Sequence, residues 1–200
     1  MATRSLDQST RTVAFLVTDG FEESELTVPL ARLRSERAGV KIVSPKKDTV
    51  RAWDRGTWSG DYPVDVPLLE ADVDSFDALV LPGGVINADF LRMDPPAVDF
   101  VRAFFDGGNP APLEPARRPV AAICHAPWIL IEAGVVSGRR LTSYPSLRSD
   151  LENAGAIWMD EEVVEDGGLI TSRRPDDLPA FNDALVAAVR RHLSAARGRA

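Results

Sequence analysis

The sequence has few of the residues that form disulfides or bind transition metals. It contains one cysteine, Cys124, and two histidines, His125 and His192. A single cysteine cannot form an intramolecular disulfide, which is compatible with a reducing compartment. One cysteine and two histidines show no metal-ligand spacing, and no glycine-rich phosphate-binding motif is present. We therefore expect neither a metal ion nor another cofactor.

Clusters of positive charge and long apolar segments are also absent from the sequence. The formal net charge is −7, and this argues against nucleic acid or an anionic membrane as a partner. No segment approaches the ~20 consecutive apolar residues of a membrane-spanning helix. Residues 1–10 are polar and lack the apolar core of a signal peptide, so we expect a flexible tail there and a cytoplasmic protein.

The sequence does contain a regular alternation of apolar strands and helical segments. With 44% hydrophobic residues, the composition is typical of a globular protein, and residues 11–195 are predicted to form a single domain. Continuous apolar strands that alternate with helices indicate an α/β fold with a mostly parallel sheet covered on both faces. The predicted strands are Thr12–Thr18, Val40–Val43, Ala78–Leu81, Pro119–Ile123, Arg140–Ser143, Glu162–Glu165 and Leu169–Ser172.

The predicted helices follow these strands. The first is expected to be capped by Ser24 and to end at Gly39, and the others are Pro96–Phe105, Ala126–Ala133, Ser146–Ala154 and Asp177–Ser194. Lys46–Glu70 shows neither period and is interpreted as a hairpin or an irregular segment. Asp106–Arg118 is rich in proline and glycine and is interpreted as a loop.

Cys124 lies where the strand Pro119–Ile123 meets the helix Ala126–Ala133. A side chain at such a corner stands clear of the sheet, as in a nucleophile elbow, and a helix N-terminus favours the thiolate form. The alternative is an inert buried thiol. The corner position and the adjacent His125 favour a reactive cysteine with a depressed pKa.

Three loops are expected to meet Cys124 beyond the carboxyl ends of the strands. One carries Glu22, Glu23 and Glu25, and a carboxyl group there could share a proton with the thiol. The backbone N–H groups of Gly84 and His125 could stabilise an oxyanion.

Four motifs make the chain resemble the ThiJ/PfpI superfamily, and its PfpI-like intracellular protease branch in particular. The motifs are Asp19–Leu26, Leu81–Gly84, Ala122–His125 and Thr142–Pro145, and the resemblance runs from about residue 11 to residue 192. It implies a flavodoxin-like, doubly wound fold. It also implies that Cys124 is the nucleophile, that Glu25 hydrogen-bonds to it, and that Glu22 and Tyr144 line the same pocket, although Tyr144 could equally be a core aromatic residue.

Members of this superfamily are described as cysteine peptidases, cofactor-free glyoxalases, deglycases or stress-response proteins. The resemblance therefore implies a hydrolase or lyase that acts on reactive carbonyls, glycated groups or peptide bonds. The alternative is a chaperone-like protein or an oxidative-stress sensor in which Cys124 is oxidised to sulfenic or sulfinic acid, without turnover.

The resemblance also implies a homodimer, or a hexamer of three dimers. In PfpI-like hexamers a glutamate reaches the histidine of a neighbouring subunit, and with one inserted residue Asp89 takes that position here. Two other departures are Ala126, where glycine is usual, and the longer loop Asp106–Arg118.

Overall fold

The computed structural model describes residues 12–105 and 118–197. The predicted tail 1–10 and nearly all of the loop 106–118 lie outside these ranges. The strands are β1 (Thr12–Leu16), β2 (Phe21–Glu22), β3 (Gly39–Ser44), β4 (Thr49–Asp54), β5 (Thr57–Pro63), β6 (Val66–Pro67), β7 (Ala78–Leu81), β8 (Val120–Ile123), β9 (Arg140–Leu141), β10 (Ile157–Trp158), β11 (Val163–Asp166) and β12 (Leu169–Ser172). The α-helices are α1 (Glu23–Ser35), α2 (Val85–Arg92), α3 (Pro95–Arg102), α4 (Pro127–Glu132), α5 (Arg148–Asn153) and α6 (Leu178–Arg197).

A seven-stranded sheet forms the centre of the molecule. Its strand order is β11-β12-β8-β7-β1-β3-β6, and every neighbouring pair is parallel except β11 with β12 at the edge. The central strands β1, β7 and β8 are apolar and almost entirely buried, because helices cover both of their faces. The predicted doubly wound α/β fold is confirmed.

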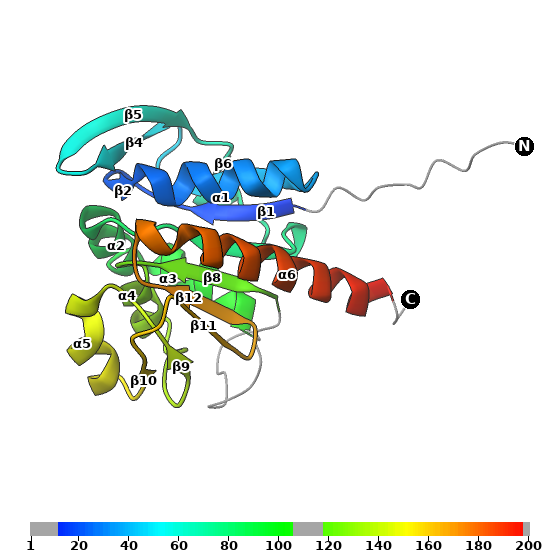
Figure 1. Cartoon of the computed structure of the whole chain (residues 1–200). Coiled ribbons are helices and arrows are strands. Elements are labelled where there is room, and N and C mark those ends of the chain that lie inside the picture. Colours follow the sequence, from blue (N-terminus) through cyan, green and yellow to red (C-terminus); the bar gives the residue numbers. More distant parts are fainter. Residues whose placement is uncertain (1–11, 106–117, 198–200) are drawn as a thin grey trace, which may run out of the picture.

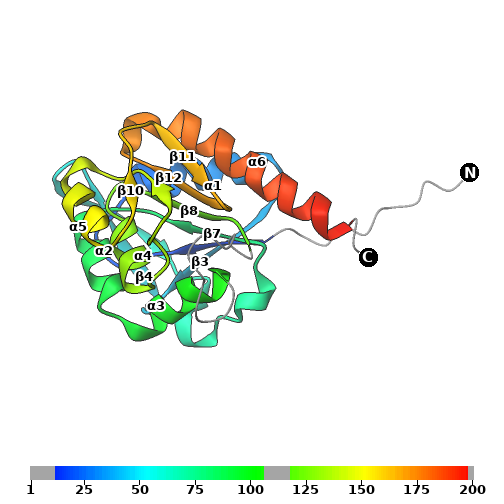
Figure 2. The same cartoon turned by 90° about the horizontal axis from the view of Figure 1, so that it is seen from below.

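The helices divide into two layers, one on each face of the sheet (Figures 1 and 2). Leu26 and Leu33 of α1 share one core cluster with Phe181 and Leu185 of α6. The core cluster on the other face of the sheet contains residues of α2, α3, α4 and α5. It also contains every second residue of the central strands, whose side chains point to that face. Within the described residues, no helix is both long and apolar enough to span a membrane.

The segment 46–70 contains a hairpin, which was one of its two predicted forms. Strands β4 and β5 pair in antiparallel fashion, and β2 joins β4 to form a small second sheet. The turn between β4 and β5 places Arg55 at φ 45° and Gly56 at φ 99°. Two residues with positive φ suit a tight hairpin because their twist matches that of the flanking strands.

Two predicted boundaries of α1 are wrong. The N-cap residue is Glu22, without a side-chain capping bond, and Ser24 lies inside the first turn. The helix ends at Ser35, and the chain reverses through Arg37 at φ 62°, whereas Gly39 already belongs to β3. At the C-terminal end, Arg37 takes the left-handed position that the prediction gave to glycine, and Ala38 N–H donates to Leu33 O at 3.0 Å, so the helix closes before Gly39.

Candidate functional site

A cavity of about 470 Å³ lies at the carboxyl ends of the central strands. Loops after β1, β7, β8, β9 and β12 and the β4–β5 hairpin supply its wall. The lining residues are Gly20, Glu22, Glu25, Trp53, Arg55, Gly84, Val85, Ile86, Cys124, His125, Tyr144 and Pro175. The structure thus brings together six of the seven residues that the sequence assigns to the site.

Cys124 occupies a strained corner of the backbone. Its φ is 63°, in the left-handed region that non-glycine residues rarely adopt. The corner is held on both sides, because Cys124 N–H donates to Ser172 O at 3.0 Å and Cys124 O accepts from Tyr144 N–H at 2.9 Å. The side chain is only 7% exposed, and the backbone N–H groups of Gly84 and His125 hydrogen-bond to its sulfur.

Glu25, in the first turn of α1, is completely buried beside Cys124. Its Oε2 accepts a hydrogen bond from Gly83 N–H at 2.7 Å. A Cβ atom at Gly83 would lie 2.7 Å from both Cys124 Cβ and Glu25 Oε2, so only glycine permits this approach. Oε1 makes no regular hydrogen bond within the described residues, yet the Cys124 thiol still influences the pKa of the carboxyl group.

The pKa values of these two acids depend on each other. Burial raises the pKa of Glu25 to about 8, so the carboxyl group keeps its proton at neutral pH. Burial, followed by the negative charge of an ionised Glu25, raises the pKa of Cys124, while the two backbone N–H groups lower it. This direction contradicts the depressed pKa expected from the sequence.

His125 is fixed by contacts on several sides. Its Nδ1 lies 3.2 Å from Cys124 Sγ, and its Nε2 lies 3.3 Å from Ser146 Oγ. Tyr144 stacks on the ring with centroids 4.7 Å apart, and Trp128 meets it edge-on at 5.5 Å. Burial lowers the pKa of His125 to about 4, so the imidazole is neutral at pH 7 and one ring nitrogen has a free lone pair.

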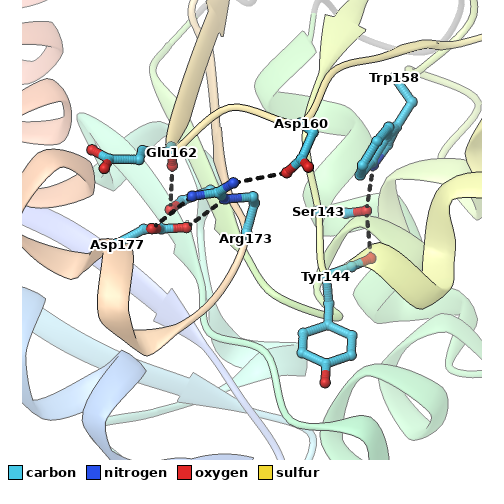
Figure 3. A network of polar contacts seen from close by, with 8 residues as sticks. Ser143, Tyr144, Trp158, Asp160, Glu162, Arg173 and Asp177 are labelled. Atoms are coloured by element: carbon cyan, nitrogen blue, oxygen red, sulfur yellow. Dashed lines mark hydrogen bonds and ion pairs between the residues drawn. The ribbon is translucent and has the colours of Figure 1, made fainter.

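Tyr144 is 40% exposed and faces the cavity, so it is not the core aromatic of the alternative interpretation. Its backbone is anchored by Ser143, whose Oγ donates to Tyr144 O at 2.9 Å and accepts from Trp158 Nε1–H at 3.0 Å (Figure 3). Figure 3 also shows Arg173, which forms ion pairs with Asp160 and Asp177. These ion pairs join the loop before β11 to the loop after β12.

The outer wall of the cavity comes from Glu22 and the β4–β5 hairpin. Burial and the charge of Asp54 raise the pKa of Glu22, whereas the backbone N–H and the charge of Arg55 lower it. The hairpin is fastened to α1 by Glu23, which accepts hydrogen bonds from Tyr62 Oη at 2.6 Å and Ser59 Oγ at 2.7 Å. Glu23 thus supports the wall without lining the cavity.

Asn87, which sequence reasoning missed, holds the loop that follows β7. Its Nδ2 donates to Pro82 O at 3.0 Å and Gly83 O at 2.9 Å, and its Oδ1 accepts from Thr18 N–H at 2.7 Å. No pattern in the sequence indicated that residues 85–92 are helical, so the position of Asn87 could not be inferred.

Sequence reasoning also missed four residues of the site that come from segments without a chemical motif. They are Trp53, Arg55, Ser146 and Pro175.

Asp89 does not reach the His125 of its own protomer. It accepts from Arg92 Nε at 2.9 Å on the same helix. Within the described ranges, no group of three or more histidine, cysteine, aspartate or glutamate side chains could hold a metal ion.

The chain is similar in sequence to a known protein family and to several of its members. A model of the DJ-1/PfpI family matches residues 11–188. Deglycase TK1284 of Thermococcus kodakarensis is 41% identical over 180 residues, which cover 89% of this chain and 99% of that protein. Protein/nucleic acid deglycase 2 of Escherichia coli is 41% identical over 171 residues, which cover 85% of this chain and 92% of that protein.

A solved structure agrees with these sequence relationships. A two-domain protein of Anabaena variabilis, with a DJ-1/ThiJ/PfpI-like and a ferritin-like domain, aligns with a TM-score of 0.79 and 32% identity. The alignment covers 89% of this chain and 48% of that protein, so this chain spans about half the length of that structure. The predicted family resemblance is confirmed, and the chain belongs to the DJ-1/PfpI family.

Proposed function

We propose that this protein is a cofactor-independent cysteine enzyme that acts on reactive carbonyls and on glycated groups of proteins or peptides. The observation that carries the proposal is the convergence of Cys124, His125 and Glu25 at the base of one cavity. Deglycases among the relatives support this class of substrate.

The chemistry begins with the addition of Cys124 Sγ to an aldehyde or ketone carbon. The thiol loses its proton to a neighbouring base, the sulfur forms the C–S bond, and the carbonyl electron pair moves to oxygen. His125 is neutral and has Nδ1 3.2 Å from the sulfur, so its position suits it to take that proton. Its lowered pKa makes it a weak base, so the transfer must accompany formation of the C–S bond. The N–H groups of Gly84 and His125 are the nearest donors for the developing negative charge.

Glu25 is the acid suited to return a proton to the adduct. It is protonated at neutral pH, and because Oε2 accepts from Gly83, its proton belongs on Oε1. A protonated carboxyl group beside a covalent adduct can act first as an acid and then, once ionised, as a base.

Incubation with defined substrates tests the proposal. Reduced protein, Cys124→Ala and an exposed control variant, Ser149→Ala, are each incubated with methylglyoxal, with a methylglyoxal-modified arginine peptide, and with a panel of unmodified peptides. We expect wild type and Ser149→Ala to consume the first two substrates and Cys124→Ala to be inactive. Cleavage of unmodified peptides alone would instead assign a peptidase.

A redox sensor is the second candidate, and the buried Glu25 carboxyl group beside the Cys124 thiol favours it. Oxidation of the thiol by peroxide would place oxygen atoms beside a carboxyl group that can donate a hydrogen bond to them. Mass spectrometry of wild type and Glu25→Ala after peroxide treatment would show whether the sulfinic acid accumulates. A sensor requires this product without any steady-state turnover by the reduced protein.

A further inference from the structure

Ser146 contacts His125 from the side opposite the thiol. Its Oγ lies 3.3 Å from Nε2 of His125, while Nδ1 of the same ring lies 3.2 Å from Cys124 Sγ. The two ring nitrogens therefore have different partners, one reactive and one not. Because the imidazole is neutral, only one of the nitrogens carries a proton. The Ser146 hydroxyl group can either donate to Nε2 or accept from Nε2–H, so the direction of this hydrogen bond decides the tautomer.

We propose that Ser146 is a positioning residue for His125: its Oγ accepts a hydrogen bond from Nε2–H and leaves the Nδ1 lone pair facing the Cys124 thiol. In the addition step, the S–H bond breaks, its proton forms the Nδ1–H bond, and the sulfur electron pair forms the bond to the substrate carbon. The resulting imidazolium still donates its Nε2–H to Ser146. The inference rests on the proposed function for its catalytic consequence, but not for the tautomer itself.

Backbone hydrogen bonds tie the turn that carries Ser146 to the elbow. Ser146 belongs to the 3-10 turn Pro145–Leu147, which directly follows Tyr144. Tyr144 is attached to the elbow through its N–H, which donates to Cys124 O at 2.9 Å, and Leu147 N–H closes the turn onto Tyr144 O at 3.0 Å. The Ser146 hydroxyl group is thus connected to Cys124 through the backbone of Tyr144. The side chain of Tyr144 also stacks on the imidazole.

Within one protomer, the acid that the sequence assigns to a partner's histidine contacts its own helix. Asp89 accepts from Arg92, and Arg92 lies over the Trp128 ring at 4.8 Å from its centroid. In the same protomer, the hydrogen-bond partner of Nε2 is the hydroxyl group of the exposed residue Ser146. A neutral hydroxyl group orients the ring without placing a charge beside the buried imidazole.

Nitrogen-15 NMR of imidazole-labelled protein measures the tautomer directly, and His192 provides a second signal in each spectrum as an internal reference. We expect wild type and Ser149→Ala to show His125 protonated at Nε2. Ser146→Ala is expected to show a mixture of tautomers or a shift toward Nδ1–H. An Nδ1–H tautomer in the wild type, or unchanged His125 signals in Ser146→Ala, would overturn the proposal.

Kinetics with methylglyoxal add a second readout. We expect Ser146→Ala to lower kcat about tenfold and to leave KM within about twofold of wild type. The missing hydrogen bond would involve a charged group only once the imidazolium forms, so the variant loses stabilisation mainly in the transition state. Ser146→Thr keeps the hydroxyl group and should recover kcat to within about threefold of wild type. A folded Ser146→Thr as slow as Ser146→Ala would contradict the proposal. Absent turnover in the wild type, with a Ser146-dependent tautomer, would contradict only the proposed function.

Discussion

Glu25 and Cys124 are two acids that share one buried site, and the charge on the first controls the ionisation of the second. An ionised Glu25 raises the pKa of Cys124 by repulsion, and this repulsion develops as the pH approaches about 8, the pKa of Glu25. Because both pKa values are raised, the site at neutral pH contains a protonated Glu25 and a Cys124 thiol.

The variant Glu25→Gln removes that charge at every pH. We expect the midpoint of Cys124 alkylation by iodoacetamide to move to lower pH than in wild type, because the thiolate then forms without a neighbouring anion. Mass spectrometry after timed labelling measures the rate at each pH, with the exposed Glu161→Gln as control. A midpoint that stays in place, or that moves to higher pH, would contradict the assigned coupling.

The stability of the fold should depend on the same proton. Burial raises the pKa of Glu25 from its ordinary value of 4.5 to about 8 in the folded protein. Its contribution to the free energy of unfolding is therefore fully present below pH 4.5 and is lost as the pH rises through about 8.

Thermal denaturation tests this sign. We expect Glu25→Gln to melt at a higher temperature relative to wild type at pH 8 than at pH 5, because glutamine has no proton to lose. Glu161→Gln should show the same difference from wild type at both values. A gain for Glu25→Gln that is larger at pH 5 would show that the buried carboxyl group is ionised in the folded state.

At the scale of elements, the geometry of the site depends on Asn87 of α2. Its side chain joins the ends of β1 and β7, through Thr18 N–H and the carbonyl groups of Pro82 and Gly83. Gly83 in turn donates to Glu25, so one buried amide indirectly positions the acid.

Replacing this amide should affect both stability and activity. We expect Asn87→Ala to lower the free energy of unfolding by about 2–4 kcal/mol, because two buried carbonyl groups and the partly buried Thr18 N–H lose their partner. Activity should fall as well, since the Gly83–Gly84 loop is no longer held. Urea denaturation and methylglyoxal turnover measure the two effects, with the exposed Asn153→Ala as a control that changes neither. An Asn87→Ala protein of wild-type stability would show that the loop is held by other contacts.

Motifs and apolar periodicity were sufficient to predict six of the seven strands of the main sheet, the elbow at Cys124 and the loops that meet it. They missed the short edge strand β6, and the predicted strand Arg140–Ser143 instead forms β9, which pairs with β10 in a separate sheet. They could not predict α2, because Val85–Arg92 follows a Gly-Gly turn without a capping residue, and its N-cap is Gly84 at φ 84°. They also could not predict the environment of Cys124. Its pKa depends on burial by elements far apart in the sequence, which a local helix N-terminus does not reveal.

At the scale of the whole molecule, the question is whether one protomer contains a complete site. Both ring nitrogens of His125 have partners in the same protomer, and so do Glu25 and the elbow backbone. The sequence instead suggested that Asp89 of a partner subunit acts on His125, within a homodimer or hexamer. Exposed apolar side chains on and next to α2, Val85, Phe90 and Met93, are candidates for such a contact between subunits.

Mixed assemblies distinguish the two arrangements. If every protomer is complete, activity in oligomers refolded from wild type and Cys124→Ala should rise in proportion to the fraction of wild-type chains. Cys124→Ala refolded together with Asp89→Asn should then show only the activity of the Asp89→Asn chains present. Light scattering establishes that the mixed species are oligomers. Activity above that sum would mean that an intact Asp89 on one chain serves an intact Cys124 on another, and it would replace Ser146 by Asp89 as the residue that orients His125.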